Sequence, residues 1–256
     1  MLLALPFGLA IGLSLGALGG GGAVLALPVL VYVLGQDVHA ATTGSLAVVA
    51  AAALAGGAAQ ASNARVCWPQ VAWFAPAALV GAVGGTLAGE TVSGAALLLG
   101  FAPILFAAAV FTWRRAGASA TDDRACPPLD RSRILAGGLA VGVLTGFFGV
   151  GGGFLVVPLL AVAMGFPLRQ AIGTSLVIVG VVSVAGLGIH LWREADLDTG
   201  VAAAMAFACA AGALIGVRVA ERLPQRALGQ AFAAVLVTVG AYILLAGALL
   251  GGPPGA

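Results

Sequence analysis

Two runs of glycine interrupt sequence that is otherwise continuously apolar. One lies in GALGGGGAVLALP, residues 16–28, and the other in GFFGVGGGFLVVP, residues 146–158. Glycine adopts unusual backbone dihedral angles and leaves the neighbouring amides unobstructed. A helix that starts after such a break directs unpaired N–H groups and the positive end of its dipole at the break, where anions bind. We therefore predict a substrate-binding site at Gly19, Gly20, Gly21, Gly22, Gly149, Gly151, Gly152 and Gly153.

Glycine can also serve helix packing, because small residues let membrane helices approach closely. Two stripes with the four-residue spacing of such packing are Gly8, Gly12 and Gly16, and Gly138, Gly142 and Gly146. The consecutive runs lack that spacing, so we interpret the stripes as packing and the runs as the binding site. Pro28 and Pro158 follow the runs and lack an N–H group, so the helix after each is predicted to start irregularly.

Hydroxyl groups follow each glycine run, in ATTGSL at residues 41–46 and AIGTSL at residues 171–176. They could donate hydrogen bonds to an anion, or bond back to carbonyl groups of their own helix, and both interpretations stay open. The candidate residues are Thr43, Ser45, Thr174 and Ser175.

Gln60 and His190 are separated by the same distance along the chain as Pro28 and Pro158. An imidazole titrates near neutral pH, so this pair is a candidate for a proton-carrying or gating role. The alternative for His190 is a position at the membrane interface.

Groups that would serve other chemistry are missing from the apolar segments. Glu90 and Glu221 lie only at predicted segment ends, whereas cation sites and proton relays within membranes usually contain carboxylates. Cys67, Cys126 and Cys209 are far apart and form no CxxC pair, so we interpret them as incidental residues without a metal or redox role. The sequence therefore predicts a small anionic substrate, no metal and no cofactor.

The composition is that of an integral membrane protein. Hydrophobic residues make up 61% of the chain and charged residues 8%, against about 25% charged in soluble domains. Apolar runs of about 20 residues suit helices that cross a bilayer. The net charge of +2 gives no indication of a nucleic-acid partner. We predict an all-α integral membrane protein whose surroundings are the lipid bilayer.

An internal repeat organises the chain. Apolar segments lie near residues 3–34, 40–61, 69–89, 93–112, 134–164, 170–191, 199–220 and 228–250. Many positions between residues 8 and 46 are identical to positions at one constant offset further along, Pro28 with Pro158 and Ser45 with Ser175 among them. We predict two homologous halves of four apolar segments each. Residues 1–113 form the first transmembrane repeat, residues 114–133 a cytoplasmic linker, and residues 134–256 the second repeat.

The first segment of each half is too long for one crossing. It is either one bent helix, so that the halves share an orientation, or a re-entrant hairpin with a glycine tip, so that the halves are inverted. Basic residues gather on the cytoplasmic side. The hairpin model leaves Arg193 alone opposite all other arginines, whereas the bent helix splits them seven to four. We therefore favour inverted repeats in a multi-pass protein of the cell inner membrane, with both termini outside.

Several of these motifs together resemble a known family. GFFGVGGGFLVVPLL, then GFPLRQAIGTSL, HLWREADLD and GVRVAERLP, are similar to the signature of the TauE/SafE sulfite exporters, also called toluene sulfonate uptake permeases. In the first half GALGGGGAVLALP keeps the glycines and proline, while ATTGSL shifts the threonine by one place. The resemblance implies a bacterial-type transporter of small sulfur-containing anions such as sulfite, sulfonates or sulfoacetate. It implies that Gly149, Gly151, Gly152 and Gly153 form the glycine-rich turn.

Energetics favour export. Moving one charge across 100 mV is worth about 2.3 kcal/mol, so an anion leaves a negative cell interior without coupling. A proton-coupled uptake permease for an organic anion is the alternative, and a non-transporting membrane assembly protein is a further one. An enzyme is not expected, because HExxH, GxSxG and a Walker lysine are absent. A co-transported proton and a second copy of the chain in a homodimer remain open as partners.

Overall fold

The computed structural model shows an all-helical protein, as the composition predicts. It describes residues 4–20, 22–23, 26, 29–30, 35, 38–89, 94–115, 126–148, 153–192 and 199–250, and no strand occurs among them. The α-helices are α1 (Ala4–Leu18), α3 (Val38–Ser62), α4 (Trp68–Gly89), α5 (Gly94–Arg115), α6 (Arg131–Phe148), α7 (Gly153–Pro158), α8 (Leu168–Trp192), α9 (Thr199–Arg222) and α10 (Gln225–Leu250). A π-helical turn, η2 (Leu159–Ala163), continues α7.

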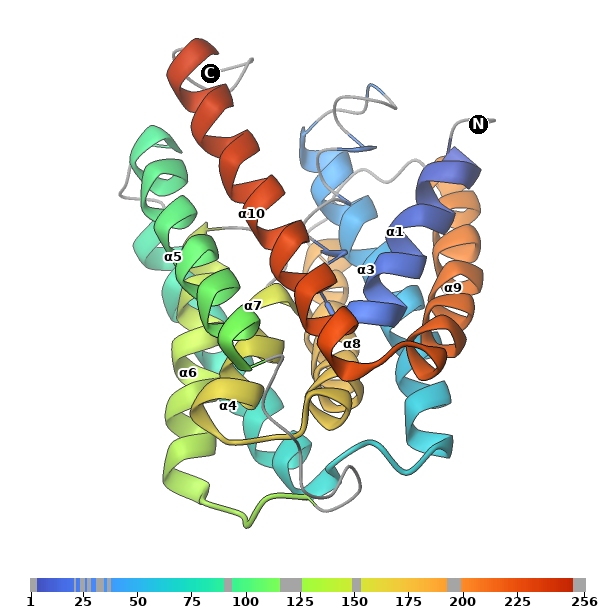
Figure 1. Cartoon of the computed structure of the whole chain (residues 1–256). Helices are drawn as coiled ribbons and strands as arrows, with labels where there is room; N and C mark the ends of the chain where they lie inside the picture. Colours follow the sequence, from blue (N-terminus) through green and yellow to red (C-terminus); the bar gives the residue numbers. More distant parts are fainter. Residues whose placement is uncertain are drawn as a thin grey trace.

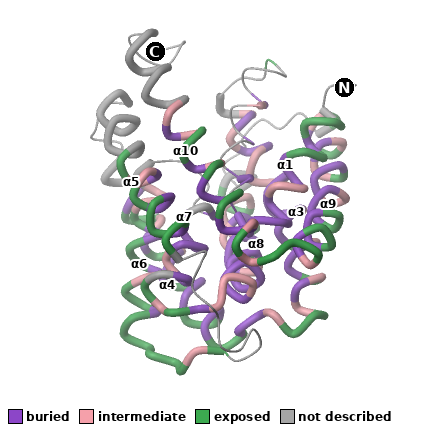
Figure 2. The backbone as a smooth tube through the Cα atoms, viewed as in Figure 1, coloured by how far each residue is buried: buried purple, intermediate pink, exposed green. Residues whose placement is uncertain are grey.

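Several helices suit a bilayer. Within the described part of the chain, Ala40–Ser62, Leu168–Ile189 and Gly200–Arg222 are long and apolar enough to cross a membrane. Large apolar side chains such as those of Val80 and Phe207 are exposed. The first half of α8 is mostly buried within the bundle (Figure 2). An apolar exterior is what lipid contact requires, because the surrounding solvent is itself hydrocarbon.

Close glycine contacts join the helices of the two halves. A Cβ atom on Gly12 of α1 would lie 2.7 Å from the carbonyl carbon of Cys209 in α9. A Cβ atom on Gly142 of α6 would lie 2.8 Å from the carbonyl carbon of Ala78 in α4. Each half thus packs its first helix against the third long helix of the other half. The packing interpretation of the glycine stripes is confirmed at Gly12 and Gly142, since only glycine allows these approaches.

The sequence repeat recurs in the helices and their ends. Helices α3 and α8 have the same length, and their first residues, Val38 and Leu168, are separated by the same offset as Pro28 and Pro158. Gly35 and Gly165 correspond at that offset too, and they have φ values of +65° and +72°. Residues 29–30 and 159–163 are both π-helical and directly follow the two prolines, as the missing N–H group predicts. Sequence repetition is therefore matched by repetition of local structure.

The arrangement of the helices in space places corresponding elements in opposite directions. In Figure 1, α3 and α5 run downward, whereas α8 and α10 run upward. Both termini lie at the top, and the segment that leads into α6 lies at the bottom. The lower end of α1 and the start of α7 are in the middle of the view.

Candidate functional site

The first glycine run ends α1 and reverses the chain. Gly19 donates its N–H to the carbonyl of Leu15 at 2.8 Å, and Gly19 and Gly20 have φ values of +69° and +109°. Such left-handed dihedral angles favour glycine because a Cβ atom would clash with the backbone. A Cβ atom on Gly22 would lie 2.6 Å from the carbonyl oxygen of Ile11, so the chain returns along α1.

The first segment of the second half also returns to the end where it began. A Cβ atom on Gly137, near the start of α6, would lie 2.6 Å from the terminal methyl group of Met164. Met164 and Phe166 line one pocket together with Asp130 and Ile134. Gly137 near the start of α6 and Met164 just after η2 therefore lie side by side.

Described residues of the two runs, Gly19 and Gly20 in the first and Gly153 in the second, meet each other near the middle of α8, and we call them the glycine turns. A Cβ atom on Gly20 would lie 2.6 Å from the carbonyl carbon of Gly153 and closer still to its oxygen. A Cβ atom on Gly153 would lie 2.9 Å from a methyl group of Val179 and 3.2 Å from the Cα atom of Gly20. The structure thus brings together residues of the two runs, which belong to different halves of the chain.

Ser175 holds the first turn against α8. Its buried hydroxyl lies 2.8 Å from the carbonyl oxygen of Gly19 and 2.8 Å from that of Ile172 in its own helix. A hydroxyl has one hydrogen, so the two carbonyls share this donor. Ser45, the counterpart of Ser175, donates to the carbonyl of Thr42 in its own helix at 2.8 Å. Among the described residues, Ser175 therefore reaches the first glycine run, whereas Ser45 bonds within its own helix.

The predicted threonines are buried. Thr174 Oγ1 accepts a hydrogen bond of 3.1 Å from the backbone N–H of Cys67, which ties α8 to the start of α4. Thr43 is fully buried in α3 and has an interaction partner. A role of these hydroxyls in anion binding stays a prediction.

Gln60 packs on α8 close to the residues that contact the first glycine turn. Its side chain is 2% exposed, and its Cβ atom would be 3.2 Å from a Cβ atom on Gly173. Among the described residues its buried Oε1 atom has no hydrogen-bond partner. Buried polar atoms are rarely left unpaired, so this amide is a candidate for contact with water or a ligand.

Some predicted site residues fall outside what can be placed. His190 belongs to α8, but its side chain lies outside the described residues. Gly21, Gly149, Gly151 and Gly152 also lie outside the described residues.

Two cysteines correct the interpretation of the sequence. Cys67 and Cys126 form a disulfide, with Cα atoms 5.8 Å apart and a sequence separation of 59 residues. The prediction that both are incidental residues is therefore wrong, although Cys209 is free and buried as expected. Spacing motifs could not find the pair, because it forms only when the end of the linker folds back onto the start of α4.

Neighbours of the disulfide form a buried polar cluster that the sequence analysis missed. Gln70 donates from Nε2 to the carbonyl of Pro127 at 2.9 Å, and Gln170 Oε1 lies 3.5 Å from Cys67 Sγ. Gln70 and Gln170 are both buried. Their positions within the first turns of α4 and α8 gave no distinguishing signal.

Charged groups of the described residues gather at the lower end of the bundle, near the linker. Arg65 pairs with Glu221 at 3.5 Å, and the guanidinium of Arg169 donates to the carbonyl of Leu223 at 2.9 Å. Asp130 precedes α6, where the Ser132 hydroxyl and then the Arg133 backbone N–H hold the pKa of its carboxyl below the usual value of 3.8. An anion that approaches from this end meets bound arginines first.

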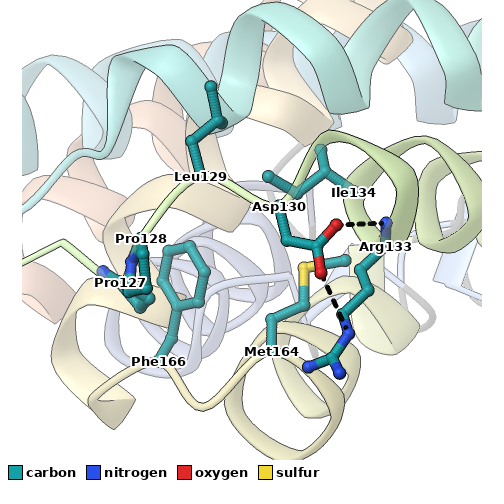
Figure 3. A pocket seen from close by; sticks show the side chains of 8 residues that line it. All are labelled: Pro127, Pro128, Leu129, Asp130, Arg133, Ile134, Met164 and Phe166. Carbon is teal, nitrogen blue, oxygen red and sulfur yellow. Dashed lines mark hydrogen bonds and ion pairs between the residues drawn. The ribbon is translucent and has the colours of Figure 1, made fainter.

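A pocket of about 250 Å³ lies at the same end and not at the glycine turns (Figure 3). It is lined by Pro127, Pro128, Leu129, Asp130, Arg133, Ile134, Met164 and Phe166. None of these is a predicted site residue, and the charged pair in its lining, Asp130 and Arg133, is joined by an ion pair of 3.1 Å. We therefore locate the candidate site at the glycine turns.

The chemistry available at the turns is that of uncharged polar groups. No group of three or more His, Cys, Asp or Glu that could hold a metal ion occurs in the described part of the chain. What remains near the turns is backbone N–H and carbonyl groups, the Ser175 hydroxyl and the Gln60 amide. Such donors suit a small anion, which backbone amides can bind without a cationic side chain.

Comparison with known proteins gives consistent matches. Residues 4–243 match the family described as "Sulfite exporter TauE/SafE". A protein of Xylella fastidiosa strain 9a5c, named "Probable membrane transporter protein", is 32% identical over 91% of both chains. A protein of the same name from strain Temecula1 is also 32% identical over 91% of both chains. A "Probable membrane transporter protein" of Methanocaldococcus jannaschii is 25% identical over 42% of this chain and 43% of its own. No solved structure matches the chain significantly.

Proposed function

The chain belongs to the sulfite exporter TauE/SafE family of membrane transporters, and we propose that it exports small sulfur-containing anions of the sulfite, sulfonate or sulfoacetate type. The observation that carries this proposal is the contact between Gly20 and Gly153, because it joins two glycine turns from different halves. Interrupted segments at matching positions in two halves are the usual location of a transporter's substrate site. The description of the family as a sulfite exporter supports the sulfur-containing substrate.

The proposed membrane arrangement is a pair of inverted repeats in the inner membrane. The opposite directions of α3 and α8 support it, as do the termini at one end and the start of α6 at the other (Figure 1). In this arrangement each half contributes one re-entrant hairpin and three crossings. Irregular backbone at membrane depth must be buried in protein or line a cavity, and the turns satisfy that condition by packing on α8 and on each other.

The proposed mechanism assigns binding to the backbone and gating to the contact between the turns. Val179 lies near the centre of α8, so the meeting point of the turns is at about half the depth of that span. An anion held there by amides and by Ser175 would separate the two halves of the bundle as it passes. Small relative movements of two packed repeats around a fixed site are the usual mode of alternating access. With the cell interior negative, the anion leaves down its electrical gradient.

Flux measurement with matched glycine variants tests the proposal. Proteoliposomes with labelled sulfite and an imposed membrane potential should show flux that follows the potential. Gly153→Val should abolish this flux, because its new side chain would collide with Val179 and Gly20. Gly188→Val is the matched control, because a Cβ atom on Gly188 meets no atom within 4 Å.

Each outcome of these measurements supports or contradicts one part of the proposal. Loss of flux in Gly153→Val alone supports the glycine turns as the pathway. Absence of flux for sulfite, sulfonates and sulfoacetate in well-folded protein contradicts the proposed substrate class. Reporter fusions at residues 120 and 256 test the membrane arrangement, which predicts opposite sides for these two positions.

A further inference from the structure

We propose that the Cys67–Cys126 disulfide is a reversible latch beside the anion pathway, and that sulfite opens it by attacking Cys126. The proposal rests on the proposed function, because it takes the proposed cargo as the attacking nucleophile. It adds a covalent regulatory site that transport alone does not require.

The disulfide connects the linker to the start of α4, which in turn contacts α8, the helix that holds the first glycine turn. Cys126 lies in the second half of the linker, residues 114–133, and Cys67 lies directly before α4. The N–H of Cys67 donates to Thr174 on α8, and the adjacent Ser175 contacts Gly19. Cys67, which anchors the linker, and Gly19 of the first turn therefore contact neighbouring residues of α8.

The two cysteine residues differ in exposure. Cys67 is 1% exposed, whereas Cys126 is exposed. A nucleophile from solution therefore reaches the sulfur of Cys126, and the sulfur of Cys67 is the leaving group. The chain itself determines the direction of cleavage.

The step balances without another reactant. The sulfur lone pair of sulfite forms a bond to Cys126 Sγ, and the bond between the two cysteines breaks. Cys67 leaves with the electron pair as a thiolate and takes a proton from water. The Cys67 sulfur is reduced, the sulfite sulfur is oxidised, and Cys126 carries an S-sulfonate group. Sulfate cannot react in this way, because its sulfur has no lone pair.

The residues around the disulfide can accommodate the free thiol that cleavage produces at Cys67. Gln170 Oε1 lies 3.5 Å from Cys67 Sγ, so it can accept the hydrogen of the new thiol. The hydrogen bond from Gln70 to the carbonyl of Pro127 then remains between the linker and the start of α4. The guanidinium of Arg131 also stays over the ring of Trp73 in α4, 5.2 Å from its centroid. These noncovalent contacts hold far less firmly than a covalent bond, so opening the bridge weakens the attachment of the linker to α4.

The proposed membrane arrangement also indicates that the Cys67–Cys126 disulfide is regulatory. It places the linker in the cytoplasm, where thiol systems keep most cysteines reduced. Disulfides that form there are mainly transient and respond to redox chemistry. A bridge at this position is therefore expected to be regulatory and not merely structural.

Peptide mapping of the full-length protein tests the chemistry. Protein purified in detergent without reductant should show one free thiol, that of Cys209. After incubation with sulfite and alkylation, mass spectrometry should find the S-sulfonate on Cys126 and the alkyl group on Cys67. Sulfate in place of sulfite should leave the bridge intact. Three free thiols at the start, cleavage by sulfate, or S-sulfonate on Cys67 would each overturn the proposal.

Transport by matched variants tests the regulatory effect. Oxidised wild type should show a lag in sulfite flux that disappears after brief pretreatment with sulfite. Cys126→Ser lacks the bridge and should start without a lag, with a several-fold faster initial flux. Cys209→Ser keeps the bridge and should behave like the wild type. Equal initial flux in oxidised wild type and Cys126→Ser would overturn the latch.

The two readouts separate this inference from the proposed function. Cleavage at Cys126 without any flux would contradict sulfite transport and leave the latch chemistry standing. Flux that is independent of the bridge would support transport and contradict the latch.

Discussion

Glycine residues make the closest backbone contacts in two regions, but for different physical reasons. In the packing region, Gly12 meets Cys209 and Gly142 meets Ala78 within regular helices. In the turn region, Gly20 meets Gly153 with a φ value of +109°. The packing glycines are needed for their small volume alone, whereas the first turn needs both small volume and a dihedral angle that other residues rarely adopt.

The two glycine regions also differ in how their backbone polar groups are paired. Backbone groups in the packing region are inside helices, where N–H and carbonyl groups pair with each other. The carbonyl of Gly19 lies beyond the last residue of α1 and reaches the side chain of Ser175 instead. At the first turn, a backbone carbonyl is therefore bonded to a side chain of another helix instead of to an N–H group of its own helix.

Gly20→Ala should have the largest effect, because it violates both requirements. A left-handed dihedral angle costs a non-glycine residue about 1–3 kcal/mol. Crowding against Gly153 adds about 1–3 kcal/mol. Denaturant unfolding in detergent should report the lost free energy, and sulfite flux should disappear in the protein that still folds. Normal flux in this variant would exclude the turn as the pathway.

Gly12→Ala and Gly142→Ala should have an intermediate effect. Each introduces a methyl group at a helix crossing, and overpacking costs about 1–3 kcal/mol without the dihedral penalty. Flux per folded molecule should stay close to that of the wild type, since neither residue contacts a glycine turn. Unfolding measurements and flux on the same preparation check this pair. A variant that folds normally and loses flux would extend the pathway to the helix crossings.

Ser175→Ala should have a smaller effect on stability and a selective one on transport. It removes the donor to the carbonyl of Gly19, and a typical hydrogen bond contributes about 0.5–1.5 kcal/mol. Flux should fall because the turn loses its contact with α8. Ser45→Ala is the matched control, since among the described residues Ser45 donates to the carbonyl of Thr42 in its own helix. Equal flux in the two variants would contradict a role for Ser175 in holding the turn.

The internal repeat and the lengths of the apolar segments explain why the sequence predicts the positions of helices well. The predicted segment at residues 170–191 corresponds to α8 (Leu168–Trp192), because apolar length and the repeat determine where a helix lies. The break after α1 follows from glycine alone, since Gly19 and Gly20 adopt dihedral angles that other residues avoid. The functional role of the predicted site residues stays a prediction.

Long-range pairs could not be predicted in the same way. Ser175 and Gly19 are far apart in the chain, and so are Cys67 and Cys126. Neither pair is related by the repeat, so each depends on how the helices pack and on where the linker folds. Local spacing predicts elements and turns, but a contact between unrelated segments requires the three-dimensional arrangement.

Gly84→Ala and Gly188→Ala should have the smallest effect, with the opposite sign. A Cβ atom on either residue meets no atom within 4 Å, and neither has a positive φ value. Alanine is favoured over glycine within a helix by about 0.5–1 kcal/mol, so both variants should be slightly more stable. Unfolding in detergent checks the gain, and flux should equal that of the wild type. If Gly188→Ala slowed transport, the upper end of α8 would belong to the pathway, and the glycine turns would be one part of a longer conduit.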